Sequence, residues 1–104
     1  MVNTFTIKFA KYGSILTTRR LGREIRTTQI ENRIRNSHRV VFDLSGIDLV
    51  THSFADECFG KLIEDFDLVF VKSTTSFESC NKKVKFQIIR VINHNLELKR
   101  RATV

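Results

Sequence analysis

The segment Val40-Val41-Phe42-Asp43-Leu44 constrains the fold more than any other part of the chain. It opens with an unbroken run of β-branched and aromatic residues, which is typical of a strand covered on both faces in the middle of a sheet. A strand of this kind needs helices packed against the sheet to bury it. We therefore expect residues 40–44 to form the central strand of an α/β domain.

The flanking segments predict the remaining elements. Alternation of Phe5, Ile7 and Phe9 with polar residues predicts a first strand over residues 3–9. Turn residues, helix caps and apolar periodicity then predict a helix over 18–36 capped by Thr17 or Thr18, a helix from Ser53 to about Asp65 and a strand over 67–72. From Asn81 onward the apolar residues fit helical spacing, although Val84, Phe86 and Ile88 also alternate as in a strand, and the length of the segment favours a helix. This order predicts a small α/β domain with a mixed or mainly parallel sheet and helices packed on it.

The helix over 18–36 has an irregular apolar face. Leu21 and Ile25 point to one side of a helix, whereas Ile30 and Ile34 drift to another. The pattern predicts a helix with poorly determined bounds.

Length and composition indicate one folded domain. The chain has 104 residues, 41% of them hydrophobic, with no Pro and four Gly, which leaves little room for linkers. We assign residues 1–98 to the α/β domain and residues 99–104 to a loose basic tail. No apolar run is long enough to span a membrane and no signal peptide is recognisable, so we expect a cytoplasmic protein that does not bind membranes.

The charge of the chain is unevenly distributed. Lys and Arg exceed Asp and Glu by seven in residues 1–39, acids exceed bases by six in residues 40–78, and bases exceed acids by six in residues 79–104. Two interpretations are open. The basic ends can form a surface for nucleic acid or an acidic partner, or they can compensate the acidic middle inside the fold.

The sequence carries no recognisable catalytic or metal-binding motif. Cys58 and Cys80 lie far apart without a second pair beside them, and we expect both to be reduced packing residues. Phosphate-binding loops, nucleophile elbows and zinc-protease signatures are absent. We therefore expect neither an enzyme nor a metal or other cofactor.

The segment from Val40 to Leu62 resembles the core of the STAS-like family, whose members are distant relatives of the anti-sigma-factor antagonists. In the wider superfamily a strand ending in D-L-S-G-V leads into D-S-S-G-L at a helix start. Residues 43–47 (DLSGI) match the first part, and residues 53–57 (SFADE) resemble the STAS-like variant of the second. The resemblance implies a regulatory module that docks on a protein, such as a kinase-like anti-sigma factor, and is released when a serine at the helix start is phosphorylated.

The match places the candidate site at the loop and helix start. Thr51 falls on the superfamily's Asp, His52 on its phosphorylated Ser and Ser53 on the residue that follows. The predicted partner-binding or switch residues are Thr51, His52, Ser53, Phe54, Asp56 and Glu57. Ser53 can also be explained as a helix cap alone, and His52 as a solvated loop residue with no second His nearby. Asp43 and Gly46 are expected to tether the loop after the strand.

Two functions from different classes remain open at this stage. The first is a regulatory protein-binding module of anti-sigma-factor-antagonist type, encoded in a bacterium, phage or mobile element, for which a host defence protein is another suitable partner. The second is a basic nucleic-acid-binding accessory protein. Its candidate contacts are Arg19, Arg20, Arg23, Arg26, Lys99, Arg100 and Arg101. The sequence does not contain a recognisable helix-turn-helix or Gly-rich clamp, which counts against the second function.

Overall fold

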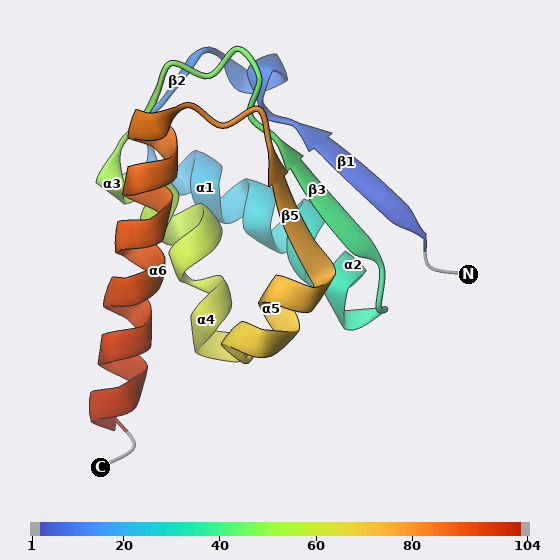
Figure 1. The fold of residues 1–104 in the computed structure, drawn as a ribbon, viewed down its shortest axis with the longest axis vertical. Helices are drawn as coiled ribbons and strands as arrows, with labels where there is room; N and C mark the ends of the chain where they lie inside the picture. Colours follow the sequence, from blue (N-terminus) through green and yellow to red (C-terminus); the bar gives the residue numbers. More distant parts are fainter. Residues whose placement is uncertain (1–2, 103–104) are drawn as a thin grey trace.

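The computed structural model describes residues 3–102 as one α/β layer structure (Figure 1). Three parallel strands form the main sheet in the order β1-β3-β5, and two short parallel strands, β2 and β4, form a second one. The strands are β1 (Thr4–Lys8), β2 (Ile15–Leu16), β3 (Arg39–Asp43), β4 (Leu49–Val50) and β5 (Thr75–Glu78). The α-helices are α1 (Arg19–Ile25), α2 (Glu31–Arg35), α3 (His52–Ala55), α4 (Leu62–Asp65), α5 (Leu68–Thr74) and α6 (Lys82–Ala102).

The described chain also contains one 3-10 turn and two π-helical turns. A 3-10 turn, η1 (Phe9–Tyr12), follows β1, and two π-helical turns, η2 (Arg26–Ile30) and η3 (Asp56–Gly60), interrupt the helices before and after β3. In η2 the N–H of Glu31 donates to the carbonyl of Arg26, five residues back. The wider turn brings Ile25 and Ile30 to the same buried side, and it explains the irregular apolar face of this helix in the sequence.

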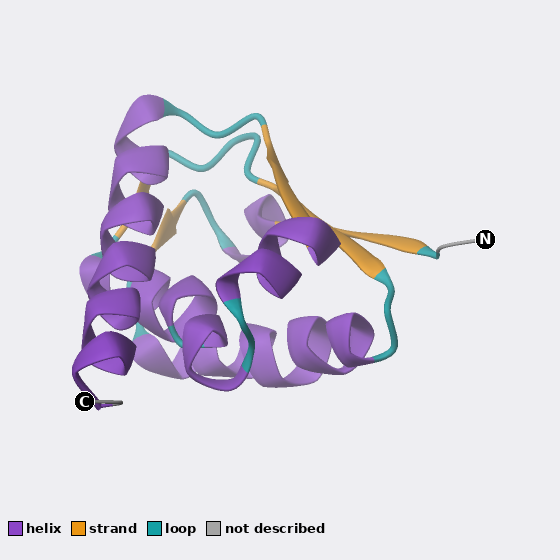
Figure 2. Ribbon diagram, turned by 60° about the horizontal axis from the view of Figure 1, so that its bottom comes forward, coloured by secondary structure: helices purple, strands orange, loops and turns teal. Residues whose placement is uncertain are grey.

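The predicted central position of β3 is confirmed, but its predicted burial on both faces is wrong. Val40 and Phe42 are buried, whereas Arg39 is exposed and Val41 and Asp43 are half-buried. Figure 2 shows why, because the helices lie against one face of the main sheet and leave the other face uncovered. The domain therefore has two layers.

The core lies between the inner face of the sheet and the helices. Buried aromatic rings from three parts of the chain meet there: Phe9 and Phe42 lie 6.0 Å apart between ring centroids, and Phe42 and Phe59 lie 5.1 Å apart. Phe54 packs edge to face on Phe9 at 6.4 Å. These contacts join β3 to η3 and fix the loop that leads from one to the other.

The strand predicted over residues 67–72 is wrong. These residues belong to α5, and the third strand begins at Thr75. Leu68 and Val71 pack on the core at helical spacing, whereas Val69 between them is 72% exposed. The side chains of Thr74 and Thr75 then donate to carbonyls of α5, at 2.8 Å and 2.7 Å, and mark its end.

The last helix is confirmed and extends further than predicted. Asn81 caps it, with its Oδ1 accepting from the N–H of Val84 at 2.8 Å. Lys99 to Ala102 continue α6 and are not a loose tail, and residues 103–104 lie outside the described part of the chain. Glu97 pairs with Arg101 one turn later, at 3.3 Å, which favours the helix in its last turn. Among the described residues, no helix is sufficiently long and apolar to cross a bilayer.

Candidate functional site at the start of α3

The loop after β3 is tethered as the sequence predicts. The Oδ1 atom of Asp43 accepts from the N–H of Ser45 at 3.0 Å and from its hydroxyl at 2.8 Å. These two hydrogen bonds lower the pKa of the Asp43 carboxyl below its usual range. Gly46 adopts φ +80°, a left-handed conformation that side chains disfavour, and so lets the loop turn back toward β4.

Thr51, and not Ser53, caps the helix. The Oγ1 atom of Thr51 accepts from the N–H of Phe54 at 3.2 Å and donates to the carbonyl of Thr17 at 2.8 Å. Because α3 begins at His52, the predicted cap role of Ser53 is wrong. The Ser53 side chain is half-buried, and its hydroxyl has no hydrogen-bond partner among residues 3–102.

His52 has a neighbour that the sequence separates from it by more than forty positions. Its ring lies 6.3 Å from that of His94 on α6, with an interplanar angle of 67°. Both residues are exposed. His52 is solvated as expected, but the expectation that no second His lies nearby is wrong, because α6 passes beside the start of α3 (Figure 1).

Two exposed aliphatic residues border this helix start. Ile15 and Leu49 are partners in the register of β2 and β4, and they are 55% and 43% exposed. The N–H of Thr51 donates to the carbonyl of Leu16 at 3.0 Å, which holds β2 against the start of α3. We call the surface formed by Ile15, Leu49, His52 and Ser53 the α3-start patch.

The other predicted partner-binding residues do not face solvent. Phe54 is fully buried, and Asp56 and Glu57 are 6% and 7% exposed. Asp56 accepts from Arg19 Nη1 and from Asn95 Nδ2, both at 2.7 Å. Burial alone would raise the pKa of the Asp56 carboxyl, but these hydrogen bonds outweigh it and lower the pKa below its usual value. These three side chains are buried beneath the candidate site and are not part of its surface.

Glu57 forms ion pairs with arginines of α1 and η2. Arg26 Nη2 lies 3.2 Å from its carboxylate and Arg26 Nε donates to its carbonyl at 2.5 Å. Arg19 and Arg23 approach the same carboxylate at 3.5 Å and 3.8 Å, and Arg26 also pairs with Glu31 at 2.9 Å. The opposite charges of the first and middle parts of the chain thus compensate each other inside the fold.

The basic residues proposed to contact nucleic acid lie on α1, η2 and α6. Arg19, Arg23 and Arg26 turn toward the acids of η3, while Arg20 is exposed on α1. On α6, Lys99 donates to the carbonyl of Ile63 at 3.0 Å, and Arg100 and Arg101 both pair with Glu97. Six of these seven side chains are thus paired with groups of the domain itself.

Asn95 was not predicted as a site residue, although its position in the helical pattern of α6 indicates a buried polar side chain. Val84, Ile88, Val91 and Asn95 recur at helical spacing on the buried face of α6, and Asn95 is 2% exposed. A polar residue on an otherwise apolar face needs a buried partner, which here is Asp56. Ile15 and His94 carry no comparable signal, because only the fold brings them to the start of α3.

The cysteines and the acidic residues give no sign of metal chemistry. Cys58 is fully buried, and burial raises the pKa of its thiol; Cys80 is half-buried and its pKa is raised for the same reason. Within residues 3–102, no three His, Cys, Asp or Glu side chains cluster closely enough to hold a metal ion.

The parallel β1-β3-β5 sheet, the tethered loop after its central strand and the helix that follows define an α/β domain of the STAS type. The model of the family described as a STAS-like domain of unknown function (DUF4325) matches residues 22–85, and the chain belongs to that family. The matched segment runs from α1 to the first turn of α6 and contains Leu49, His52 and Ser53. No curated protein and no solved structure matches the chain significantly.

Proposed function

We propose that this domain is a regulatory protein-binding module that docks on its partner through the α3-start patch, and that it works by binding and not by catalysis. The observation that carries the proposal is the pair Ile15 and Leu49, which lie side by side and exposed on β2 and β4, and Leu49 precedes His52 and Ser53 by only a few residues in the chain. Apolar residues surrounded by accessible polar groups are typical of the centre of a protein interface. The resemblance to anti-sigma-factor antagonists supports the same part of the fold.

The side chains beneath the patch give it a fixed shape. Thr51 ties α3 to the chain before α1, and Asp56 ties η3 to both α1 and α6. A pre-organised surface loses little conformational freedom on binding, so more of its contact energy appears as affinity.

Ser53 is the residue at which charge should regulate docking. Its hydroxyl is not used in the fold and lies in the patch, one residue after the position of the superfamily's phosphorylated serine. A phosphate there adds a charge of about −1.5 to −2, which would have to be desolvated against Leu49 and Ile15 in a docked complex. A kinase-like anti-sigma factor is the partner class that fits this arrangement, and a host defence protein is the alternative.

The test is quantitative affinity capture from the native host with matched variants. A partner recovered in stoichiometric amount by the unmodified chain should be lost with Leu49→Asp and with Ser53→Glu. It should be retained with Val69→Asp, which places the same acid on an exposed residue of α5. Intact-mass measurement of the captured chain reports whether Ser53 or Thr51 carries phosphate. Retention of the partner by both patch variants would refute the proposed docking surface.

Nucleic-acid binding is the alternative, and the internal ion pairs of Arg19 and Arg26 reduce its support. A binder that neutralises several phosphates loses affinity steeply with salt, with a log–log slope of about 0.9 per phosphate on duplex DNA. Fluorescence anisotropy with duplex DNA and single-stranded RNA at several salt concentrations separates the two functions. We expect no salt-dependent binding at micromolar protein.

A further inference from the structure

The aromatic core reaches the surface at the outer edge of β5. Phe77 lies 4.9 Å from Phe42 and 5.5 Å from Phe59 between ring centroids, and both of those rings are fully buried. Phe77 itself is 40% exposed, although it belongs to the same cluster. Within residues 3–102 the sheet ends at β5, and no further strand there covers this ring.

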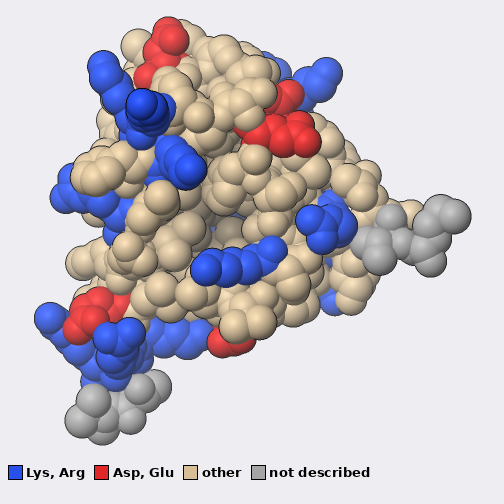
Figure 3. Space-filling model, in the orientation of Figure 1, with Lys and Arg blue, Asp and Glu red and all other residues tan. Residues whose placement is uncertain are grey.

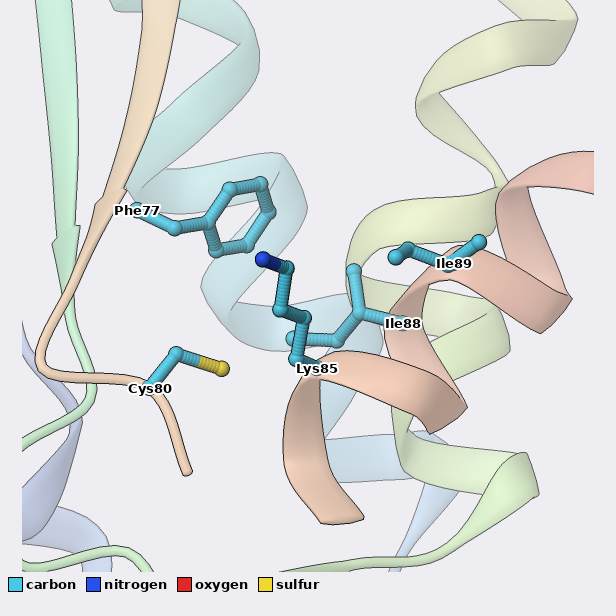
Figure 4. A pocket seen from close by; sticks show the side chains of 5 residues that line it. All are labelled: Phe77, Cys80, Lys85, Ile88 and Ile89. Atoms are coloured by element: carbon cyan, nitrogen blue, oxygen red, sulfur yellow. The ribbon is translucent and has the colours of Figure 1, made fainter. Parts of the chain in front are cut away.

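Two hollows lie along one side of α6, and Figure 4 shows the five side chains that line the first of them. One hollow of about 250 Å³ lies between β5 and α6, and a second of about 200 Å³ lies between α5 and α6. Ile89, which is 47% exposed, lines both and joins them. The first is lined by Phe77, Cys80, Lys85, Ile88 and Ile89, and the second by Leu68, Val71, Lys72, Ile89, Ile92, Asn93 and Leu96. We call the two together the β5–α6 groove.

The backbone of β5 is open toward this groove. The N–H of Leu44 donates to the carbonyl of Glu78 at 2.9 Å, so Glu78 turns its backbone groups toward β3. Backbone groups alternate in direction along a parallel strand, so the N–H and C=O of Phe77 point away from β3. No described residue pairs with the Phe77 amide. An unpaired strand edge beside exposed apolar side chains is a template for another strand.

The charged side chains that line the groove have one sign. Lys85 lines the first hollow and Lys72 the second, and neither hollow is lined by an acid. Neither lysine forms an ion pair with any residue in the described part of the chain. Figure 3 shows Lys and Arg side chains on both sides of the hollow in the middle of this face.

We propose that the β5–α6 groove binds an extended segment of a partner protein, with alternating apolar residues and acids, which adds to the sheet as a fourth strand beside β5. Its apolar side chains cover Phe77 and Ile89, and its acids pair with Lys85 and Lys72. The face of α6 from Lys85 to Leu96 is about 16 Å long at 1.5 Å per residue. An extended segment of about five residues spans that length.

This second surface is independent of the α3-start patch. It is formed by β5, α5 and one face of α6, whereas the patch is formed by β2, β4 and α3. A partner can therefore contact both surfaces or either one, and variants of one surface should leave binding at the other unchanged.

The test begins with a phage-displayed library of random twelve-residue peptides selected on the folded domain. We expect enriched peptides to alternate apolar residues with acids. Their affinity should fall about tenfold or more in the double variant Lys72→Glu/Lys85→Glu. It should remain within about twofold in Lys8→Glu/Lys11→Glu, which changes the charge equally on exposed residues of β1 and η1, and in Ser53→Glu. Circular dichroism melting shows whether each variant folds.

Hydrogen exchange distinguishes strand addition from simple adhesion. Binding of an enriched peptide should slow exchange of the Phe77 amide, which has no partner in the free domain. Enrichment of basic or featureless peptides, or binding that leaves this amide unprotected, would overturn the proposal. So would a stable dimer of the free domain in sedimentation that Phe77→Asp dissociates, since the groove would then be occupied by a second copy of the chain.

Discussion

Replacement of Gly22 by Ala should destabilise the domain, although the same change stabilises most helices. Gly22 lies in α1 where this helix packs against α3 and η3, and it is buried. A Cβ atom there would lie 2.8 Å from the carbonyl oxygen of Phe54 and 3.1 Å from the N atom of Cys58. Both are backbone atoms of the neighbouring helix, so they cannot move out of the way by a side-chain rotation. The two helices would have to separate.

The expected change in the free energy of unfolding is the sum of two opposing contributions. Ala is favoured over Gly in a helix by about 1 kcal/mol. Overpacking in a dense core costs about 1–3 kcal/mol, and contact with a backbone falls at the upper end. We expect a net loss of about 1–2 kcal/mol in the free energy of unfolding, and a decrease in Tm of about 5–10 °C for a domain of this size.

Urea denaturation followed by far-ultraviolet circular dichroism measures this loss. Asn32→Ala is the matched control, because Asn32 is exposed on α2 and gains helix propensity without a contact. The control should be as stable as the parent or slightly more so. If Gly22→Ala were also as stable as the parent, the close approach of α1 to η3 would be wrong.

Three substitutions and one labelling experiment test further features of the structure. Thr51→Val should cost about 1 kcal/mol of stability in urea denaturation, because it removes the cap of α3. Arg26→Met should lower the free energy of unfolding by about 3–5 kcal/mol in the same assay. The reason is that Glu31 and Glu57 lose the cation that they share in a nearly buried position. A loss below about 1 kcal/mol would contradict a stabilising role of these ion pairs. The lowered pKa of Asp56 stabilises the fold above pH of about 4, and that contribution is lost as the pH falls through the native pKa. Asp56→Asn should therefore flatten the decrease in unfolding free energy between about pH 5 and 2 measured by denaturation at each pH. In the native protein a thiol reagent should modify Cys80 and leave Cys58 unmodified until unfolding; equal rates would contradict the burial of Cys58.

The regular parts of the fold were predictable because several signals agree there. In β1 and β3 the apolar pattern agrees with β propensity. The helical spacing of the last segment also allowed a strand over its first residues, and its length decided correctly for a helix. The prediction of a strand over 67–72 was wrong because the short apolar run from Leu68 to Val71 is compatible with a buried strand and with a short helix. Only the core contacts of Leu68 and Val71 decide between them.

The motif gave a position along the chain for the candidate site, which stays a prediction, but not the depth of its residues in the fold. The motif led to residues 51–57, yet it could not show that Phe54, Asp56 and Glu57 face inward. Their partners are distant in sequence: Arg19 is 37 residues from Asp56, and Asn95 is 39 residues from it. The orientation of a helix depends on such contacts, and local sequence does not contain them.

The two π-helical turns, η2 and η3, also affect how this chain can be compared with its relatives. Each holds one residue more than an α-helical turn across the same span, as the bond from the N–H of Lys61 to the carbonyl of Asp56 illustrates at 2.8 Å. A family member with a regular helix at either place should align with a one-residue gap inside 26–30 or 56–60. An alignment without that gap would shift every position after it by about 100°, and it would equate buried residues of one protein with exposed residues of the other.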